Sequence, residues 1–357
     1  FPLISNLQEP SDYEDDFDTG PTEDGGMCNT YDTVMSFRSQ YEPPLFWIIF
    51  ILGAVGNLLV VWIYSTVRNR LKTMTDVYLL NLAVADLLFL CTLPFLAVEA
   101  IKYWNFGLAL CKTVLAVYRI NFFSGMLLLT CISVDRYISI VQVTKAQNTK
   151  KQRLFWSKLI CLIVWVVSTL LALPEFIYAR VKTKQRDQSL CTLIYWDNSE
   201  NQIKILVLSI QICMGFWLPL MVMIFCYSVV IRTLLQARNF QKHKALRVIF
   251  AVVLVFVLSQ LPYNSLLIFE TTQAANTTMS SCETRINLEL AKQITKSLAY
   301  AHACLNPFLY AFIGVRFRQD LLGIARTCAG LGLIKLPAIP KRSSVASDMD
   351  TIPALSI

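Results

Sequence analysis

The sequence predicts an all-α membrane protein, a bundle of seven transmembrane helices followed by a short amphipathic helix. Apolar residues make up 55% of the 357-residue chain and charged residues only 16%, whereas soluble proteins carry about 25% charged residues. Seven mostly apolar stretches are long enough to cross a bilayer. They lie near 46–67, 76–101, 109–141, 156–178, 204–234, 246–270 and 289–313. Their apolar residues come in long runs without alternation, which favours helices over barrel strands.

Basic residues between the stretches predict the orientation, because short cytoplasmic loops are enriched in Lys and Arg. They follow the first, third, fifth and seventh stretches. They are Arg68, Arg70, Lys72, Lys145, Lys150, Lys151, Arg153, Arg238, Lys242, Lys244, Arg247, Arg316, Arg318 and Arg326. One basic run, from Arg180 to Arg186, lies on the other side and argues against this orientation. The three basic loops and the basic tail on the predicted cytoplasmic side outweigh it. We therefore expect the N-terminus outside the cell.

Residues 1–45 precede the first stretch, and we expect a disordered extracellular tail there. This tail is acidic, with no Lys or Arg before Arg38. Such a segment buries too little apolar surface to fold alone, but it can order on a basic partner. A merely solvated tail is the plain alternative. Tyr13 lies among acids that include Asp15 and Asp16, a context that suits tyrosine sulfation.

The eleven cysteines separate by position along the chain. Six lie within the apolar stretches, where a free cysteine behaves as a small hydrophobe. Cys28, Cys191 and Cys282 lie in outer segments and Cys111 lies at the outer head of the third stretch, where an oxidising compartment favours two disulfides. Three pairings are open. We favour Cys111 with Cys191, which ties the loop after the fourth stretch to the third, and Cys28 with Cys282, which ties the tail to the seventh. Asn276 begins an Asn-Thr-Thr glycosylation signal in the same outer loop as Cys282.

Polar residues inside the stretches are costly in a bilayer, so each is a candidate functional residue. They are Asn57, Asp86, Asn121, His302 and Asn306. The alternative is a hydrogen-bonded packing network, which His302 would join through Asp86 and Asn306. An ionised Asp86 requires a cation, a proton or several donors. A sodium ion near Asp86 is the one cofactor that we consider.

Sequence motifs fall one set per stretch, in order. They are Gly56-Asn57, "NLAVADL" around Asp86, Asp135-Arg136-Tyr137, Trp165, Pro219 with Tyr227, Pro262, and Asn306-Pro307-Phe308-Leu309-Tyr310. This ordered set resembles the rhodopsin-like G-protein-coupled receptors over residues 40–327. Within that family, "KTMTDVYLLNLAVADLLFLCTLPF", "DRYISIVQ" and "CLNPFLYAFIGVRFR" are similar to the chemokine receptors. "RTLLQARNF" is most similar to the CC receptors that home lymphocytes, type seven first and types six, nine and ten close.

The resemblance implies a plasma-membrane receptor for a CC chemokine. It implies signalling through an inhibitory-class heterotrimeric G protein, with arrestin and receptor kinases as further partners, to drive chemotaxis and calcium signals. The four outer cysteines match the family's two-disulfide pattern. A scavenger receptor without signalling is the alternative, which the intact Asp135-Arg136-Tyr137 disfavours. A transporter or channel is a remote alternative, because the stretches do not form two matching halves.

Catalytic chemistry is not expected. We find no nucleophile, acid–base pair or phosphate loop with suitable spacing, and His243 and His302 are the only histidines. We therefore expect no enzyme, no metal site and no nucleic-acid partner.

The resemblance gives a role in switching and coupling to seven residues. They are Asp135, Arg136, Tyr137, Tyr227, Asn306, Pro307 and Tyr310. It implies that Asp135 holds Arg136 while the bundle is closed, and that Arg136 extends to the G protein when the bundle opens. Two departures from the family occur nearby. Residues 241–244, Gln-Lys-His-Lys, offer no acid to clamp Arg136, and Ser139 replaces the usual Ala.

The ligand pocket implied by the resemblance also departs from the family pattern. Leu96 stands where Trp is usual, and Lys296 stands where an acid is common. Arg119 follows Tyr118 and adds a second base. A cationic ligand group would need another acid.

Three glutamates are candidates for that acid: Glu99, Glu270 and Glu289. We rank Glu270 and Glu289 first, because they flank the mouth of the predicted pocket. In the tail, Tyr13, Asp15 and Asp16 are further candidate ligand contacts.

The chain after residue 313 is expected on the cytoplasmic side. Residues 314–328 suit a short amphipathic helix on the membrane lipid, with Cys328 as a palmitoylation candidate. Residues 329–357 form a tail with candidate kinase sites for arrestin binding. These sites are Ser343, Ser344, Ser347, Thr351 and Ser356.

Overall fold

The computed structural model describes residues 30–66, 73–141, 150–184, 188–195, 200–236, 243–276, 282–313 and residue 323. Residues 1–314 belong to one compact unit. Residues 315–357 belong to a second unit, of which only Gly323 is described. The predicted amphipathic helix, most of the acidic tail and the C-terminal tail therefore lie outside the described residues.

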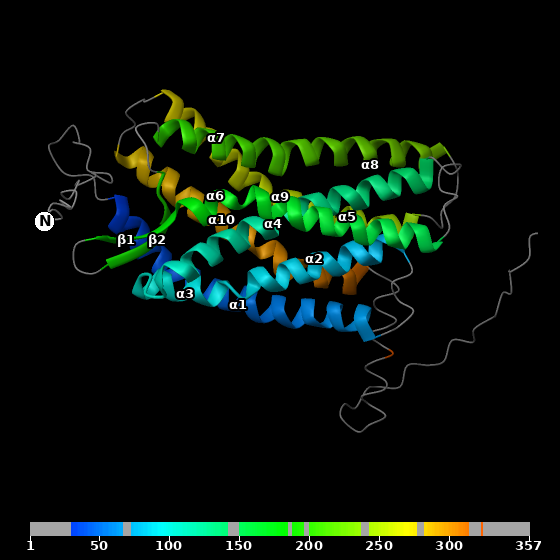
Figure 1. The fold of residues 1–357 in the computed structure, drawn as a ribbon, viewed down its shortest axis with the longest axis horizontal. Coiled ribbons are helices and arrows are strands. Elements are labelled where there is room, and N and C mark those ends of the chain that lie inside the picture. Colours follow the sequence, from blue (N-terminus) through cyan, green and yellow to red (C-terminus); the bar gives the residue numbers. More distant parts are fainter. Residues whose placement is uncertain are drawn as a thin grey trace, which may run out of the picture. The chain divides into compact units, whose positions relative to one another are not determined.

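The first unit is a bundle of long helices (Figure 1). Each predicted stretch is helical, and three stretches consist of consecutive helices. In chain order they are α1 (Thr30–Thr66), α2 (Met74–Leu90) with α3 (Leu93–Lys102), α4 (Gly107–Val141), α5 (Lys150–Leu171) with α6 (Leu173–Tyr178), α7 (Glu200–Ile212) with the π-helix η2 (Cys213–Trp217) and α8 (Leu218–Gln236), α9 (His243–Asn276), and α10 (Cys282–Ile313). The breaks before α3 and α6 precede Pro94 and Pro174, which lie in the first turns of these helices, since proline is tolerated in a first turn but not further inside.

Six helical segments of the described chain are long and apolar enough to cross a membrane. They are Asp32–Ser65, Met74–Lys102, Gly107–Val141, Gln152–Tyr178, Gln202–Thr233 and Phe250–Thr272. The seventh predicted stretch forms α10, which packs between α1 and α9. Its first half is less apolar because it carries Glu289, Lys292 and Lys296, which line a cavity described below. The predicted seven-helix bundle is confirmed.

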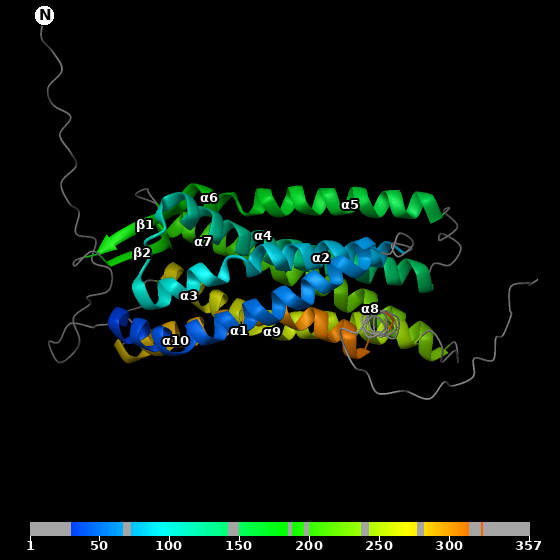
Figure 2. The same ribbon diagram turned by 90° about the horizontal axis from the view of Figure 1, so that it is seen from below.

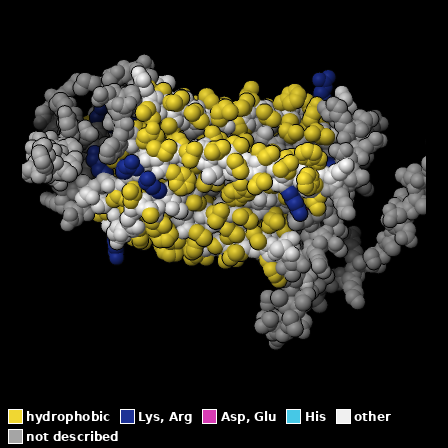
Figure 3. Space-filling view, in the orientation of Figure 1, with side chains coloured by type: hydrophobic (Ala, Val, Ile, Leu, Met, Phe, Trp, Pro, Cys, Tyr) yellow, Lys and Arg dark blue, Asp and Glu magenta, His cyan; other side chains and the backbone are white. Residues whose placement is uncertain are grey.

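The outer face of the bundle is apolar. Large hydrophobic side chains such as Trp47, Phe155 and Met221 are exposed. Figure 3 shows apolar side chains over the middle of one face, with Lys and Arg towards its two ends. This distribution matches an apolar bilayer core between polar interfaces.

One small sheet lies at the end of the bundle where α1 and α10 begin (Figures 1 and 2). Strand β1 (Ala179–Lys184) pairs antiparallel with β2 (Gln188–Leu193), and Val181 faces Cys191. The sequence predicted only a loop here. The hairpin is held to α4 by the disulfide between Cys111 and Cys191.

The first helix begins earlier than predicted, which corrects the boundary at residue 45. Residues 30–45 belong to α1. Arg38 and Glu42 pair at 2.9 Å one turn apart, and Tyr41 lies 3.3 Å from the Ser297 hydroxyl of α10. These contacts, with the burial of Met35 and Glu42, extend the helix beyond its apolar run.

Candidate functional site

Helix α4 connects three groups of functional side chains along the bundle. Cys111 lies near its start, Asn121 near its middle and Asp135 near its end. At 1.5 Å rise per residue, Asn121 lies about 15 Å and Asp135 about 36 Å along the helix from Cys111. We call the three groups the outer cavity, the central polar cluster and the inner end.

The outer cavity has a volume of about 450 Å³. It is lined from α1, α3, α4, α6, β2, α7, α9 and α10. All six predicted ligand contacts that the structure describes line it. They are Glu99, Tyr118, Arg119, Glu270, Glu289 and Lys296. The other three, Tyr13, Asp15 and Asp16, lie outside the described residues.

Two of the three candidate acids already have basic partners. Glu270 of α9 pairs with Lys204 of α7 at 3.0 Å and with Lys292 of α10 at 2.8 Å. Lys292 also lies 3.5 Å from Glu289. Glu270 and Glu289, the two acids ranked first from the sequence, thus already have lysine partners. The sequence did not predict these pairs.

A second ion pair in the outer cavity is more deeply buried. Arg119 of α4 donates to Glu175 of α6, and the two side chains are only 10% and 3% exposed. Glu175 was missed by the sequence reasoning. Its signal was available, because it is an acid inside an apolar stretch, directly after Pro174.

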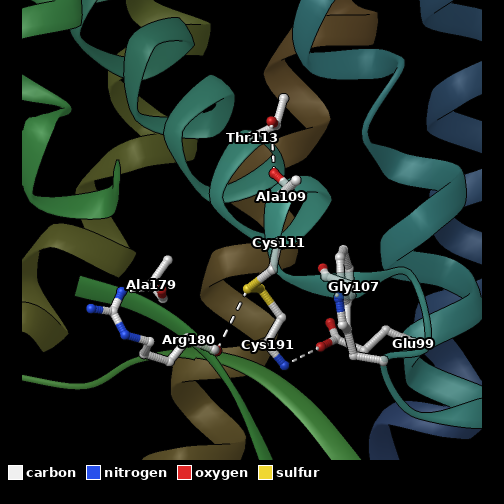
Figure 4. The surroundings of a disulfide bond; sticks show 9 residues. Glu99, Gly107, Ala109, Cys111, Thr113, Ala179, Arg180 and Cys191 are labelled. Carbon is white, nitrogen blue, oxygen red and sulfur yellow. Dashed lines mark hydrogen bonds between the residues drawn. A yellow bond between two sulfur atoms is a disulfide. The ribbon is translucent and has the colours of Figure 1, made fainter. Parts of the chain in front are cut away.

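Glu99 lies beside the disulfide. Its Oε1 accepts a hydrogen bond of 3.2 Å from the backbone N–H of Cys191 (Figure 4), and the residue is 4% exposed. Within the part of the chain that the structure describes, Glu99 makes no ion pair within 4.0 Å, and neither does Lys296, whose Nζ lies 5.8 Å from the Tyr300 ring centre. Glu99 and Lys296 are therefore an acid and a base of the outer cavity that no described residue pairs within this distance.

The disulfide predicted between Cys111 and Cys191 is confirmed. Cys282 is also disulfide-bonded. Its predicted partner Cys28 lies outside the described residues, so that pairing stays a prediction. Cys328 lies outside as well, and Asn276 ends α9 with a side chain that is not described.

The central polar cluster surrounds Asp86, which is completely buried. Asn121 donates to its Oδ1 at 2.9 Å, and Asn306 donates to its Oδ2 at 2.8 Å. His302 Nε2 lies 3.7 Å from Oδ1, and Gln260 lies 3.4 Å from the other ring nitrogen. The structure thus brings together α2, α4, α9 and α10. Gln260 was missed by the sequence reasoning.

Asn57 belongs to a separate contact between helices. Its side chain donates to the carbonyls of Gly53 and Ala303, at 3.0 and 2.8 Å, and so joins α1 to α10. Gly56 lies against Pro307 of α10. A Cβ at Gly56 would lie 2.8 Å from the Cβ of Pro307, so only glycine allows this approach.

The inner end lies at the opposite end of α4 from the disulfide, where α2 and α5 begin and α8 ends (Figure 1). Arg136 pairs with Asp135 at 3.2 Å and also donates to the Thr75 hydroxyl of α2. Arg153 of α5 is a second base on Asp135, at 3.1 Å. Thr75 and Arg153 as partners were missed by the sequence reasoning.

The aromatic residues of the inner end contact neighbouring helices. The Tyr137 ring lies 6.0 Å from Phe225 of α8, and Tyr227 lies 6.0 Å from Phe250 of α9. Tyr310 is helical, but its side chain is not described. Among the described residues, no group of three His, Cys, Asp or Glu side chains is placed to hold a metal ion.

Comparison with known proteins adds independent evidence. Residues 56–310 match the family model described as 7 transmembrane receptor (rhodopsin family). The chain is 46% identical to C-C chemokine receptor type 9 of Ovis aries, over 84% of this chain and 81% of that protein. It is 45% identical to type 9 of Homo sapiens, over 84% and 80%. With C-C chemokine receptor type 7 of Homo sapiens it shares 48% identity, over 83% and 77%.

Proposed function

Because the chain belongs to the C-C chemokine receptors of the rhodopsin family, we propose that it binds a CC chemokine outside the cell and activates an inhibitory-class G protein inside it. It is a multi-pass membrane protein and a receptor, not an enzyme. In this proposal it resides in the plasma membrane with its N-terminus outside, and arrestin and receptor kinases end its signal.

One observation carries the coupling part of the proposal. Arg136 is held by Asp135 and Thr75 at the end of the bundle that lies opposite the outer cavity. A side chain held by ion pairing has a second arrangement available once those contacts break. A ligand shifts such a two-state element only through contacts that differ between the states.

The outer cavity supports a peptide ligand with both charged and apolar groups. It offers Glu99 and Lys296 without ion-pair partners within the described chain, next to apolar residues such as Leu96 and Val114. We assign a cationic ligand group to Glu99, in place of the Glu270 and Glu289 that the sequence ranked first. Binding the cationic group at Glu270 would require breaking the ion pairs of Glu270 with Lys204 and Lys292.

The experiment that tests the function is ligand-stimulated nucleotide exchange. Membranes from cells that express the chain are mixed with purified inhibitory-class G protein and a panel of CC chemokines. At least one chemokine should accelerate exchange above the level of membranes from untransfected cells. Uptake of a labelled chemokine without exchange would instead establish the scavenger function.

A sodium ion is a second ligand that we propose, in the central polar cluster. The residues present fit a hard cation, which prefers oxygen ligands. The Asp86 carboxylate is buried there, and the side-chain oxygens of Asn121 and Asn306 have no hydrogen-bond partner among the described residues. The two amides now donate their N–H groups to the carboxylate, so they would hold the ion together with Asp86 after turning their oxygens towards it. The charge of the ion would offset that of the carboxylate.

A further inference from the structure

The Asp135 carboxylate forms ion pairs with two arginines from different helices, Arg136 of α4 and Arg153 of α5. Its Oδ2 lies 3.2 Å from Arg136 Nη2 and accepts from the Thr75 hydroxyl at 3.3 Å. Its Oδ1 accepts from Arg153 Nη2 at 3.1 Å. The same nitrogen of Arg153 donates to the Ser139 hydroxyl at 3.0 Å. Ser139 lies one helical turn after Asp135, so both acceptors are on one face of α4.

We propose that Arg153 is a positioning residue for coupling, which keeps Asp135 paired when Arg136 leaves it to meet the G protein. Ser139 orients Arg153 for this role. The inference rests on the proposed function, because it concerns the step in which Arg136 is released. It assigns a role to Ser139, the position where the sequence departs from the family's usual Ala.

Burial makes the second arginine necessary. The Asp135 side chain is 5% exposed, and a buried carboxylate that loses its only cation is strongly destabilised. With Arg153 in place, the departure of Arg136 leaves the carboxylate with one cation and with the Thr75 hydroxyl. The open state therefore retains a paired Asp135.

Repulsion between the two arginines acts in the same direction. Arg136 and Arg153 share one carboxylate, so the group carries a net positive charge. Two like charges that bind the same carboxylate repel each other, which weakens the hold of Asp135 on Arg136. Arg153 thus makes the closed arrangement less favourable as well as the open one more favourable.

Ser139 restricts a long side chain. Arg153 is 35% exposed, and an exposed arginine loses rotamer freedom when it is fixed in one geometry. Two acceptors for one nitrogen, the Asp135 carboxylate and the Ser139 hydroxyl, fix that nitrogen more firmly than either does alone. An alanine at 139 would leave only the carboxylate.

The first test uses thermal unfolding of the purified full chain in detergent and needs neither ligand nor G protein. Arg136→Ala represents the departure of Arg136. In that background, Arg153→Gln should lower the apparent melting temperature by about 2 °C or more beyond its effect in the parent. Adding Asp135→Asn should remove this extra loss. Equal losses in both backgrounds would show that Arg153 only anchors α5 and would overturn the inference.

The second test measures coupling and does not depend on the Arg136 variant. Arg153→Gln should lower maximal chemokine-stimulated nucleotide exchange about threefold or more, an effect near 0.7 kcal/mol, with chemokine affinity unchanged. Arg153→Lys should recover part of the response, and Ser139→Ala should lie between the parent and Arg153→Gln. Lys158→Gln, which changes an exposed base on the same helix, is the matched control.

The outcomes separate this inference from the proposed function. A raised basal exchange in Arg153→Gln would mean that Arg153 locks the closed state, and would overturn the inference. A parent that responds to no chemokine in the panel would reject the proposed function, and the thermal cycle would still decide the role of Arg153.

Discussion

Arg136 is the residue on which the coupling hypothesis depends most directly. Its guanidinium contacts both Asp135 and Thr75, and a planar group with several donors serves two acceptors better than a single ammonium does. We predict that Arg136→Lys leaves surface expression and chemokine binding near those of the parent. Ligand-stimulated nucleotide exchange should fall about tenfold or more. Full coupling by this variant would show that Arg136 only anchors α4 at the lipid headgroups.

Glu99 gives a prediction that distinguishes among the acids of the outer cavity. Glu99→Gln should raise the chemokine Kd about tenfold or more, since a buried charged contact is lost. Glu289→Gln is the comparison, because Glu289 is 40% exposed and already lies near Lys292. Its effect on Kd should be severalfold smaller in competition binding with labelled chemokine. A larger effect of Glu289→Gln than of Glu99→Gln would mean that the ligand's cationic group binds at the mouth of the cavity.

Residue types inside the apolar stretches were good predictors of the central cluster, and poor predictors of ion pairing. Asp86, Asn121, His302 and Asn306 were found because polarity inside a membrane stretch is a local signal. The pairing of Glu270 with Lys204 and Lys292 was not found. These residues lie far apart in sequence, and only the packing of α7, α9 and α10 brings them together.

At the scale of elements, the contact between α1 and α10 depends on a glycine. A Cβ at Gly56 would lie 2.8 Å from Pro307 Cβ, so Gly56→Ala should force the helices apart and lower the free energy of unfolding by about 1–3 kcal/mol. The measurement is the apparent melting temperature of the purified receptor in detergent.

The control for Gly56 is a lipid-facing position of the same helix. Leu58 is 57% exposed, so Leu58→Ala should change the melting temperature much less. An unchanged melting temperature in Gly56→Ala would show that α1 shifts without cost. Asn57 alone would then account for the contribution of the Gly56-Asn57 motif to the contact between α1 and α10.

Elements were predictable where one local pattern defines them. The seven stretches were found because apolar runs of about 20 residues are a direct consequence of bilayer thickness. The start of α1 at Thr30 and the β1–β2 hairpin were missed. Both depend on partners elsewhere in the chain: Ser297 for the first turns of α1, and Cys111 for the hairpin.

At the scale of the whole molecule, the central polar cluster lies between the two ends that the proposed function connects. We predict that Na⁺ raises the melting temperature of the purified parent more than K⁺ does, at equal ionic strength. Asp86→Asn should abolish the difference, because the charge that attracts the cation is lost. Asn57→Ala, which changes a residue outside the Asp86 contacts, should retain it. An Asp86→Asn variant that still distinguishes the two ions would place the sodium effect elsewhere.

The acidic tail gives a prediction about encounter with the ligand. Removal of residues 1–26 retains Cys28 and deletes the acidic run. Association with a basic chemokine should slow about tenfold and depend less on salt, because attraction between exposed charges is screened over about 8 Å at physiological ionic strength. Stopped-flow association at several salt concentrations measures both quantities. An unchanged rate and salt dependence would mean that the tail is a solvated segment without this role.

The free cysteines make this receptor a suitable background for site-directed labelling. Among the described residues the free thiols are Cys91, Cys131, Cys161, Cys213, Cys226 and Cys304, and all lie within the membrane-spanning region. Water-soluble maleimides react with thiolates, which form poorly away from water. Once Cys328 is replaced, a single cysteine introduced at the end of α8 would carry a fluorophore with little competing label. The movement of the inner end could then be followed spectroscopically in an otherwise native sequence.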